Sequence, residues 1–219
     1  MNALDGKPLL YDPDTRTWSH PFDQFPPGPV MTTASGLVID YLRPEDLEIR
    51  DEDVRDAATH ICRYNGARQV QLIHHFALCT LLAQHEFAVP RTIGLIAQHD
   101  FPEAILGDVV SGLKKLLVDY RTLEPRWEAR FWDHYGYIPP NAAEAALIRH
   151  IDLRALVVET HMTQHPVAGY TAYRHGGPPT RSEVRAWERM MTYDRDRCWE
   201  LTLRAVREGA TPSGASASP

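Results

Sequence analysis

The spacing of the apolar residues is the feature that most constrains the fold of this chain. In residues 51–64 the apolar residues recur at three- and four-residue intervals, and residues 69–85 repeat the pattern. This spacing lays one apolar stripe along an α-helix, whereas a half-buried strand would alternate at every second residue. Further helical segments are expected at 109–119, 122–135, 142–162 and 180–208. We therefore predict an all-α fold, a bundle of six to seven core helices.

The N-terminal and C-terminal ends of the chain do not share this pattern. Residues 1–30 are rich in Pro, Asp and aromatic side chains without a sustained period, which predicts an irregular extension that is laid on the domain or is partly disordered. The segment 31–42 places β-favouring residues around a Ser-Gly turn and predicts a small hairpin. Small residues dominate 209–219, which predicts a disordered tail. The main domain is thus expected to span 31–208.

Composition narrows the class of protein. The 219 residues are 43% hydrophobic and 24% charged, as in ordinary soluble domains with a substantial core. A formal net charge of −6 disfavours a broad nucleic-acid surface but leaves small anionic substrates open. The N-terminus lacks the pattern of a signal peptide, and the apolar runs are too short to span a membrane. We expect a cytoplasmic protein that binds neither nucleic acid nor membranes.

The cysteines do not suggest a disulfide framework. Cys62, Cys79 and Cys198 are odd in number and far apart, and they form no C-x-x-C pair. We expect reduced thiols that pack as small hydrophobic side chains.

Polar residues interrupt a helix that Pro90 is expected to start, because proline is tolerated in the first helical turn. His99 and Asp100 are adjacent, and Pro102 follows them. Neighbours on a straight helix point about 100° apart, so they reach one ion most easily where a helix ends. The residue before a proline is displaced from helical geometry. The sequence therefore predicts a break at the His-Asp pair.

Two further polar positions lie in apolar helical segments. VQLIHHFALCTLL contains His74 and His75, and IRHIDLRALVVE contains Asp152. Buried carboxylates are costly unless they are paired or bind a cation. One divalent ion held by His75, His99, Asp100 and Asp152 would account for all of these residues. This ligand set suits Mn²⁺, Co²⁺ or Mg²⁺, with Fe²⁺ and Zn²⁺ as alternatives.

The order His…His-Asp…Asp across helices resembles the HD phosphohydrolase superfamily. The segments ICRYNGA, HDFPEAILGDVVSGLK, YRTLE and HIDLRALVVE are similar to motifs of its branch of bacterial 5′-deoxynucleotidases and phage-type dATP triphosphohydrolases. TASGLVIDYLRPEDLEIRDEDV also resembles the hairpin and first helix of the phage-type members. The resemblance covers roughly residues 31–162 and implies an HD-domain helical bundle.

The chain departs from the family pattern in two places. Phe76 stands where the family has a small residue, and GDVVSGLK lacks both prolines of the family's GDIPSPVK. The choice between His74 and His75 as the metal ligand is open. The resemblance favours His75, because Leu72 then falls on the family's apolar position.

The resemblance implies a deoxynucleotide hydrolase with a role for each matching residue. Arg63 would clamp a phosphate, with Tyr64 beside the substrate, and Lys114 would meet a distal phosphate or an acidic neighbour. Glu103, together with Asp108, would take the proton of an activated water that attacks phosphorus in line. The structural alternatives are a surface position for Arg63, a helix N-terminal carboxylate for Glu103 and a helix cap for Asp108. Three matching positions are equally open to purely structural pairing: Tyr120, Glu124 and Glu159.

Several functional alternatives stay open. Cleavage at the α-phosphate would release phosphate from a deoxynucleoside monophosphate or tripolyphosphate from a dNTP. A degenerate HD protein that binds a nucleotide and regulates a partner, or a hydrolase of a signalling nucleotide, are alternatives of another kind. The resemblance also implies a homo-oligomer, in the host cytoplasm if the chain is phage-encoded. The apolar residues of 180–208 would form the interface or complete the core: Val184, Trp187, Met190, Met191, Trp199 and Leu203.

Overall fold

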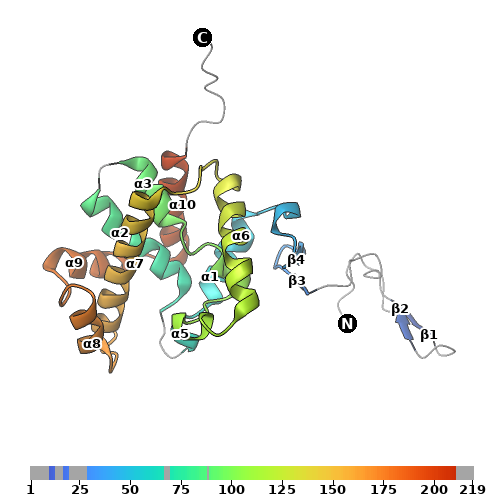
Figure 1. The fold of residues 1–219 in the computed structure, drawn as a ribbon, viewed down its shortest axis with the longest axis horizontal. Coiled ribbons are helices and arrows are strands. Elements are labelled where there is room, and N and C mark those ends of the chain that lie inside the picture. The colour runs from blue at the N-terminus through green and yellow to red at the C-terminus, as the bar shows by residue number, and fades with distance from the viewer. Residues whose placement is uncertain (1–9, 13–16, 20–28, 67–69, 88, 211–219) are drawn as a thin grey trace, which may run out of the picture. The chain divides into compact units, whose positions relative to one another are not determined.

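The computed structural model describes residues 10–12, 17–19, 29–66, 70–87 and 89–210. Helices make up most of these residues (Figure 1), which confirms the predicted all-α fold. None of the helices in the described ranges is long and apolar enough to cross a membrane. Contacts divide the chain into two units, Met1–Leu47 and Glu48–Pro219, and the hairpin predicted in 31–42 falls in the first.

The first unit contains two short antiparallel strand pairs. β1 (Leu10–Asp12) pairs with β2 (Thr17–Ser19), so the prediction of irregular structure is wrong for these strands. The other residues of 1–28 lie outside the described residues. β3 (Val30–Thr32) pairs with β4 (Val38–Asp40), which confirms the predicted hairpin. A 3₁₀ turn, η3 (Pro44–Asp46), follows.

The second unit is built around α2 (Leu72–Glu86). This helix packs against α1 (Asp51–His60), α3 (Pro90–Ala97), α7 (Ala142–Met162), α9 (Arg181–Met190) and α10 (Arg195–Gly209). Every residue from Leu72 to Ala83 except His74 is buried, as expected of a helix surrounded by others. A histidine inside such a helix, His75, needs polar partners from neighbouring helices.

A close approach of α3 and α10 fixes the end of α3. A Cβ at Gly94 would clash with the hydroxyl of Tyr137 and lie 2.9 Å from the carbonyl oxygen of Ala205. The same hydroxyl donates a hydrogen bond of 2.6 Å to the carbonyl of Val206. Because only glycine leaves room for this contact, Gly94 sets the position of the segment that leads into His99 and Asp100.

The remaining helices are α4 (Glu103–Leu106), α5 (Ser111–Lys114), α6 (Val118–His134) and α8 (Ala168–Arg174). Seven helices in the described part of the chain have eight residues or more, in agreement with the predicted six to seven. α7 matches the predicted range 142–162, and a capping box of Asn141 and Glu144 sets its start. The short helix α8 was not predicted.

Three predicted helices differ from the structure. The segment 180–208 is not one helix but two, because Asp194 caps α10 by accepting a hydrogen bond of 2.7 Å from the backbone N–H of Arg197. The segment 109–119 forms only α5 before α6 begins at Val118. α1 ends at His60 rather than at residue 64, because Cys62 forms an isolated bridge with Gln71. In the predicted tail, Gly209 still belongs to α10, and 211–219 lie outside the described residues.

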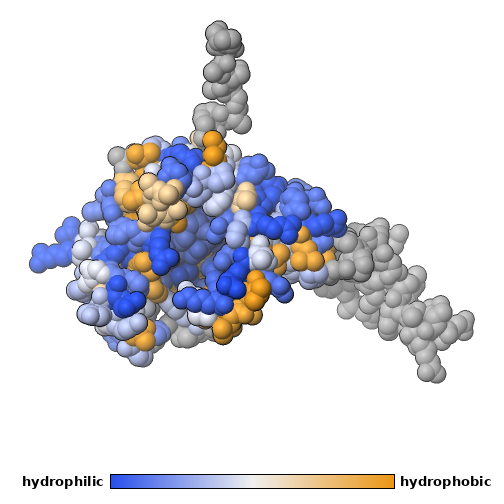
Figure 2. All heavy atoms as spheres, viewed as in Figure 1, coloured by the Kyte–Doolittle hydropathy of each residue, from blue (hydrophilic) through white to orange (hydrophobic). Residues whose placement is uncertain are grey.

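Most of the apolar residues named in 180–208 lie in the core, whereas Val184 is half-buried and Met191 is 56% exposed. Four of them are buried: Trp187, Met190, Trp199 and Leu203. On the face shown in Figure 2, hydrophobic residues gather instead near α5 and the start of α6. The exposed apolar side chains of this segment are Leu113, Leu116, Leu117 and Val118.

Candidate metal centre

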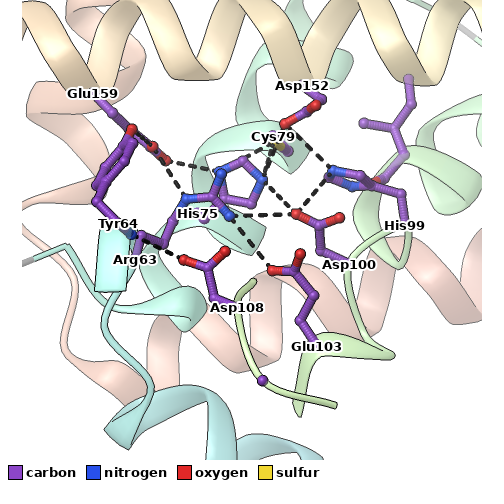
Figure 3. Close-up of polar contacts among 12 residues, drawn as sticks. Arg63, Tyr64, His75, Cys79, His99, Asp100, Glu103, Asp108, Asp152 and Glu159 are labelled. Carbon is purple, nitrogen blue, oxygen red and sulfur yellow. Dashed lines mark hydrogen bonds and ion pairs between the residues drawn. The ribbon is translucent and has the colours of Figure 1, made fainter. Parts of the chain in front are cut away.

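Four predicted ligands from three separate parts of the second unit meet in one place (Figure 3). His75 comes from α2, His99 and Asp100 from the turn after α3, and Asp152 from α7. One ligand atom of each lies within 4.8 Å of the others, so the group can hold a metal ion. The Oδ2 atom of Asp100 is 3.1 Å from Nε2 of His75 and 3.4 Å from Nε2 of His99. Oδ1 of Asp152 lies 3.7 Å and 3.9 Å from the same two nitrogens.

The turn that carries His99 and Asp100 confirms the predicted break. α3 ends at Ala97, and α4 begins at Glu103, directly after Pro102. Phe101 anchors the turn because its ring is fully buried and packs 4.9 Å from Phe76, measured between ring centroids. Phe76, which stands where the family that the sequence resembles has a small residue, therefore packs against the turn through its ring. With Phe101 inserted in the core, the adjacent His-Asp pair faces the cluster.

Both imidazoles are oriented by hydrogen bonds at Nδ1. The Nδ1 atom of His75 lies 2.7 Å from Oε1 of Glu159, and that of His99 lies 2.7 Å from the carbonyl oxygen of Ile96. Each contact requires an Nδ1–H donor, so Nε2 is the ring nitrogen that would bind an ion, with loss of its own proton. Nε2 of His99 is buried and has no hydrogen-bond partner among the described residues. A buried nitrogen without a partner is rare, and a bound cation would satisfy it.

The electrostatics of the cluster favour positive charge. Burial lowers the pKa of His99, but the carboxylates of Asp100 and Asp152 outweigh it and raise the pKa to about 10. Burial raises the pKa of Asp100, but His99, His75 and Arg63 hold it well below its usual value. Burial raises the pKa of Asp152, but the nearby imidazole of His99 outweighs this effect and lowers the pKa. A centre that binds protons this strongly also attracts a divalent cation.

Glu159 closes the other end of the cluster. It is fully buried, accepts a hydrogen bond of 2.6 Å from the hydroxyl of Tyr64 and lies 3.3 Å from Nε of Arg63. Burial raises the pKa of Glu159, but Arg63 and His75 outweigh burial and lower it to about 2. The structural pairing considered for Glu159 from the sequence is thus observed. Its carboxylate holds the Nδ1 atom of His75 and so orients the imidazole ring.

Arg63 and Tyr64 occupy a strained turn beside the ligands. Arg63 is buried, and its NH1 atom lies 3.4 Å from Asp100 and 3.7 Å from Glu103. The surface position considered for Arg63 is therefore wrong. Tyr64 has a φ angle of 60°, an uncommon conformation for a residue with a side chain. Its N–H donates a hydrogen bond of 3.0 Å to Oδ2 of Asp108, which holds this conformation.

Glu103 lies between the arginine and a lysine. Its Oε1 atom accepts a hydrogen bond of 3.0 Å from Nζ of Lys114, whereas Oε2 is buried without a hydrogen-bond partner among the described residues. Burial, reinforced by the charge of Asp100, raises the pKa of Glu103 to about 8. Lys114 also donates a hydrogen bond of 2.5 Å to Glu124. The sequence left a distal phosphate or an acidic neighbour open for Lys114, and the structure shows acidic neighbours.

The structure decides two questions that the sequence left open: whether Asp108 caps a helix, and whether His74 or His75 joins the ligand group. Asp108 does not cap the following helix, because α5 has no side-chain cap. His74, which is half-buried on the same helix as His75, lies outside the ligand group, and burial and Arg195 lower its pKa. His75 is therefore the residue that the structure brings to the centre.

Sequence reasoning missed two residues near the centre. Cys79, which was expected only to fill space, lies 3.5 Å from Nε2 of His75 through its Sγ atom. Burial raises the pKa of Glu128 on α6 to about 7, and the charges of Glu124 and Asp100 add to this effect. The available signals were the spacing of four residues from His75 to Cys79 and from Glu124 to Glu128, which places each pair on one helix face.

Comparison with known proteins identifies a relative without a known activity. No family model matches the chain. Over 122 residues it is 30% identical to the uncharacterized protein YfdR of Escherichia coli (strain K12). This match covers 55% of the chain and 63% of that protein, so the chain spans less than two thirds of the relative's length.

Proposed function

We propose that the protein is a metal-dependent phosphohydrolase of the HD superfamily that cleaves 2′-deoxynucleoside 5′-phosphates at the α-phosphate. The observation that carries the proposal is the buried Nε2 atom of His99, which has no hydrogen-bond partner in the described part of the chain and lies within 4.8 Å of ligand atoms of a second imidazole and two carboxylates. This atom lies 3.4 Å from Oδ2 of Asp100 without a hydrogen bond, and a bound cation would satisfy it. The deoxynucleotide specificity rests on the sequence resemblance alone.

His75, His99, Asp100 and Asp152 would hold one divalent ion; their mutual distances and the buried Nε2 atom of His99 support this fit. Two nitrogen and two oxygen ligands suit Mn²⁺, Co²⁺ or Mg²⁺ and leave coordination positions for water and substrate. When bound, the ion supplies Lewis-acid polarisation of a phosphoryl oxygen and of water.

Arg63 is placed to bind the phosphate. Its NH1 atom points toward Asp100 and Glu103, where two acidic groups surround one guanidinium nitrogen. Burial lowers the pKa of Arg63, but these carboxylates and Glu159 outweigh it and raise the pKa well above its usual value, so the charge is permanent. A planar guanidinium matches the geometry of phosphate oxygens and stabilises their charge during displacement.

Glu103 would move the proton. Its Oε2 atom has no hydrogen-bond donor among the described residues, while Lys114 holds Oε1 at 3.0 Å. Lys114 thus orients the carboxyl group, and Oε2 would accept the proton of the attacking water. A pKa raised to about 8 is closer to neutral pH than that of an ordinary glutamate, as general acid–base catalysis requires.

Asp108 and Tyr64 support this arrangement. Because Oδ2 of Asp108 accepts from the N–H of Tyr64, we assign Asp108 to holding the Arg63 segment and leave proton transfer to Glu103. The aromatic ring of Tyr64 lies 5.8 Å from the guanidinium carbon of Arg63 and would adjoin the bound substrate.

A substrate panel tests the proposal. Purified protein would be assayed with deoxynucleoside mono- and triphosphates and with ribonucleotides, in the presence of Mn²⁺, Co²⁺ or Mg²⁺, with phosphate and tripolyphosphate resolved as products. We expect hydrolysis of deoxynucleotides that stops on chelation and returns with the ion. Metal-dependent nucleotide binding without turnover would favour the regulatory alternative, and turnover that survives exhaustive chelation would refute the metal mechanism.

Self-association is part of the proposal. Most of the apolar side chains of 180–208 are buried within the chain and do not offer an interface. The exposed apolar side chains of α5 and the start of α6, with Leu116 at 77% exposure, are the surface to test. Leu116→Glu is expected to shift the mass in light scattering toward the monomer.

A further inference from the structure

Cys79 places a thiol at the edge of the candidate metal centre. It follows His75 by one turn of α2, is fully buried, and its Sγ atom lies 3.5 Å from Nε2 of His75. His75, Cys79 and His99 form a second group whose ligand atoms all lie within 4.8 Å of one another. The thiol is therefore close enough to join the two imidazoles as a third donor.

A second observation points independently to a ligand at this group. The side chain of His99 is only 9% exposed, and its Nε2 atom has no hydrogen-bond partner in the described part of the chain. This nitrogen faces both the carboxylates and the sulfur. It can therefore serve an ion bound on either side.

The resting thiol does not yet point at such an ion. Sγ lies 3.9 Å from Nδ1 of His75, only slightly farther than from Nε2, so the sulfur lies beside the imidazole ring rather than in line with the Nε2 lone pair. Rotation about the Cα–Cβ bond of Cys79 must turn the sulfur toward the ion. His75 is the only hydrogen-bond partner of this thiol among the described residues, so the rotation breaks no other hydrogen bond.

We propose that His75, Cys79 and His99 form a thiophilic metal site that takes Zn²⁺ in preference to Mn²⁺ or Mg²⁺. The inference rests on the proposed function, because the imidazoles of His75 and His99 would also bind the proposed catalytic ion. Thiolate and imidazole ligands favour Zn²⁺, whereas carboxylate oxygens favour Mg²⁺ and Mn²⁺. On binding, a metal–sulfur bond forms, the S–H bond breaks and its proton leaves to solvent, with no change in oxidation state.

This arrangement makes the two ions compete. An ion on the nitrogen–sulfur set uses the Nε2 atoms that the nitrogen–oxygen set also needs, so one centre cannot hold both at once. Zn²⁺ bound through Cys79 would therefore exclude the ion held by Asp100 and Asp152. Cys79 thus sets the metal selectivity of the centre.

Cobalt spectroscopy tests the sulfur ligand without any assay of hydrolysis. Co²⁺ added to the full chain is expected to give a near-ultraviolet sulfur-to-cobalt charge-transfer band. Cys79→Ser and Cys79→Ala should both lose this band, while visible cobalt bands from imidazole ligation remain and thermal unfolding confirms that each variant is folded. The matched controls, Cys62→Ser and Cys198→Ser, should keep it. No band in the wild-type protein, or a band that persists without Cys79, overturns the proposal.

Competition titrations measure the selectivity. With a chromophoric chelator, removal of the thiol should weaken Zn²⁺ binding by at least about tenfold and change Mn²⁺ binding by less than about twofold. Equal losses for both ions would contradict the inference. A charge-transfer band without nucleotide hydrolysis would refute the proposed function alone, and Mn²⁺-dependent hydrolysis without the band would refute this inference alone.

Discussion

The two sides of the polar cluster differ in how completely their groups are paired. The closed side consists of Arg63, Tyr64 and Glu159, and the open side of His99, Asp100, Glu103 and Asp152. On the closed side, Glu159 is fully buried and has three neighbouring partners in His75, Tyr64 and Arg63. On the open side, the Asp152 side chain is 38% exposed, and one buried atom each of His99 and Glu103 lacks a hydrogen-bond partner within the described residues. On the closed side the same holds of Nε of Arg63, which lies 3.3 Å from Oε2 of Glu159 as an ion pair.

This difference indicates which groups stabilise the fold and which groups bind a ligand. Partnered buried charges hold a structure together, and removal of one partner leaves the others uncompensated. Unpaired polar atoms beside an exposed carboxylate cost stability, and such a cost persists where a ligand offsets it. Glu159 on the closed side is therefore expected to govern stability, and the open side to govern metal binding and proton transfer. Arg63 contributes to both, because it pairs with Glu159 and is the proposed phosphate ligand.

The largest expected effect is on the open side. Asp152→Asn removes the charge of a proposed metal ligand and should lower kcat/KM for the best deoxynucleotide by about a thousandfold or more, measured with saturating Mn²⁺. Because Asp152 is partly exposed and lies no closer than 3.7 Å to its histidine neighbours, the free energy of unfolding in chelator should change by less than about 1 kcal/mol. If Asp152→Asn lost activity only because its free energy of unfolding also fell strongly, Asp152 would be a structural residue and not a metal ligand.

The next effect is on the closed side. Glu159→Gln leaves Arg63 and His75 without their buried counter-charge and should lower the free energy of unfolding by about 3–5 kcal/mol. Urea denaturation followed by circular dichroism measures it. The matched control is Glu200→Gln on α10, where an exposed pair with Arg197 is expected to contribute at most about 1 kcal/mol. A similar small change in both variants would show that the closed side is not a structural support.

The same contrast explains how far the sequence could predict the site. His75, His99, Asp100 and Asp152 were identifiable because charged groups in apolar helices have few explanations, and Pro102 marked the break between α3 and α4. Cys79 was read as a hydrophobic side chain because a cysteine in an apolar helix has an ordinary explanation. Its place beside His75 depends on the rotation of α2 against its neighbours, which periodicity alone does not fix.

The fold shows a similar limit. The long periodic segments gave α7 its correct bounds, since a capping box stands at Asn141 and the apolar pattern persists to Met162. The division of 180–208 depends instead on one side chain, Asp194, which caps α10. A local hydrogen bond of this kind competes with continued helix and is weak evidence in sequence, because aspartate is also common on exposed helix faces.

A third prediction tests the open side through ligand-linked stability. At a Mn²⁺ concentration of about 100 times Kd, the wild-type protein should gain about 2.7 kcal/mol of stability. His99→Ala should abolish this gain because it removes the unpaired ligand nitrogen. His74→Ala, one residue from His75 but outside the cluster, should keep it. Thermal unfolding with and without the ion measures both, and an equal loss in the two variants would mean that the cluster is not the binding site.

The smallest expected effect concerns Glu128, which faces the cluster from α6 and whose pKa is raised to about 7 by burial and by Glu124. The folded state therefore retains a proton that the unfolded chain releases near pH 4.5, so wild-type stability should fall as pH rises between about 4.5 and 7. Glu128→Gln cannot ionise and should escape this loss. From pH 5 to pH 8 its advantage over wild type should grow by about 1–2 kcal/mol, less than the full shift implies because Glu128 is partly exposed.

Urea denaturation at both pH values, in chelator, measures this change in advantage. Chelation matters because a bound cation beside Asp100 would lower the pKa of Glu128 and hide the effect. The matched control is Glu188→Gln, at an exposed position of α9, which should show no such growth. If the advantage of Glu128→Gln is the same at pH 5 and pH 8, burial and the neighbouring carboxylates of Glu124 and Asp100 do not raise the pKa of Glu128 in the folded protein.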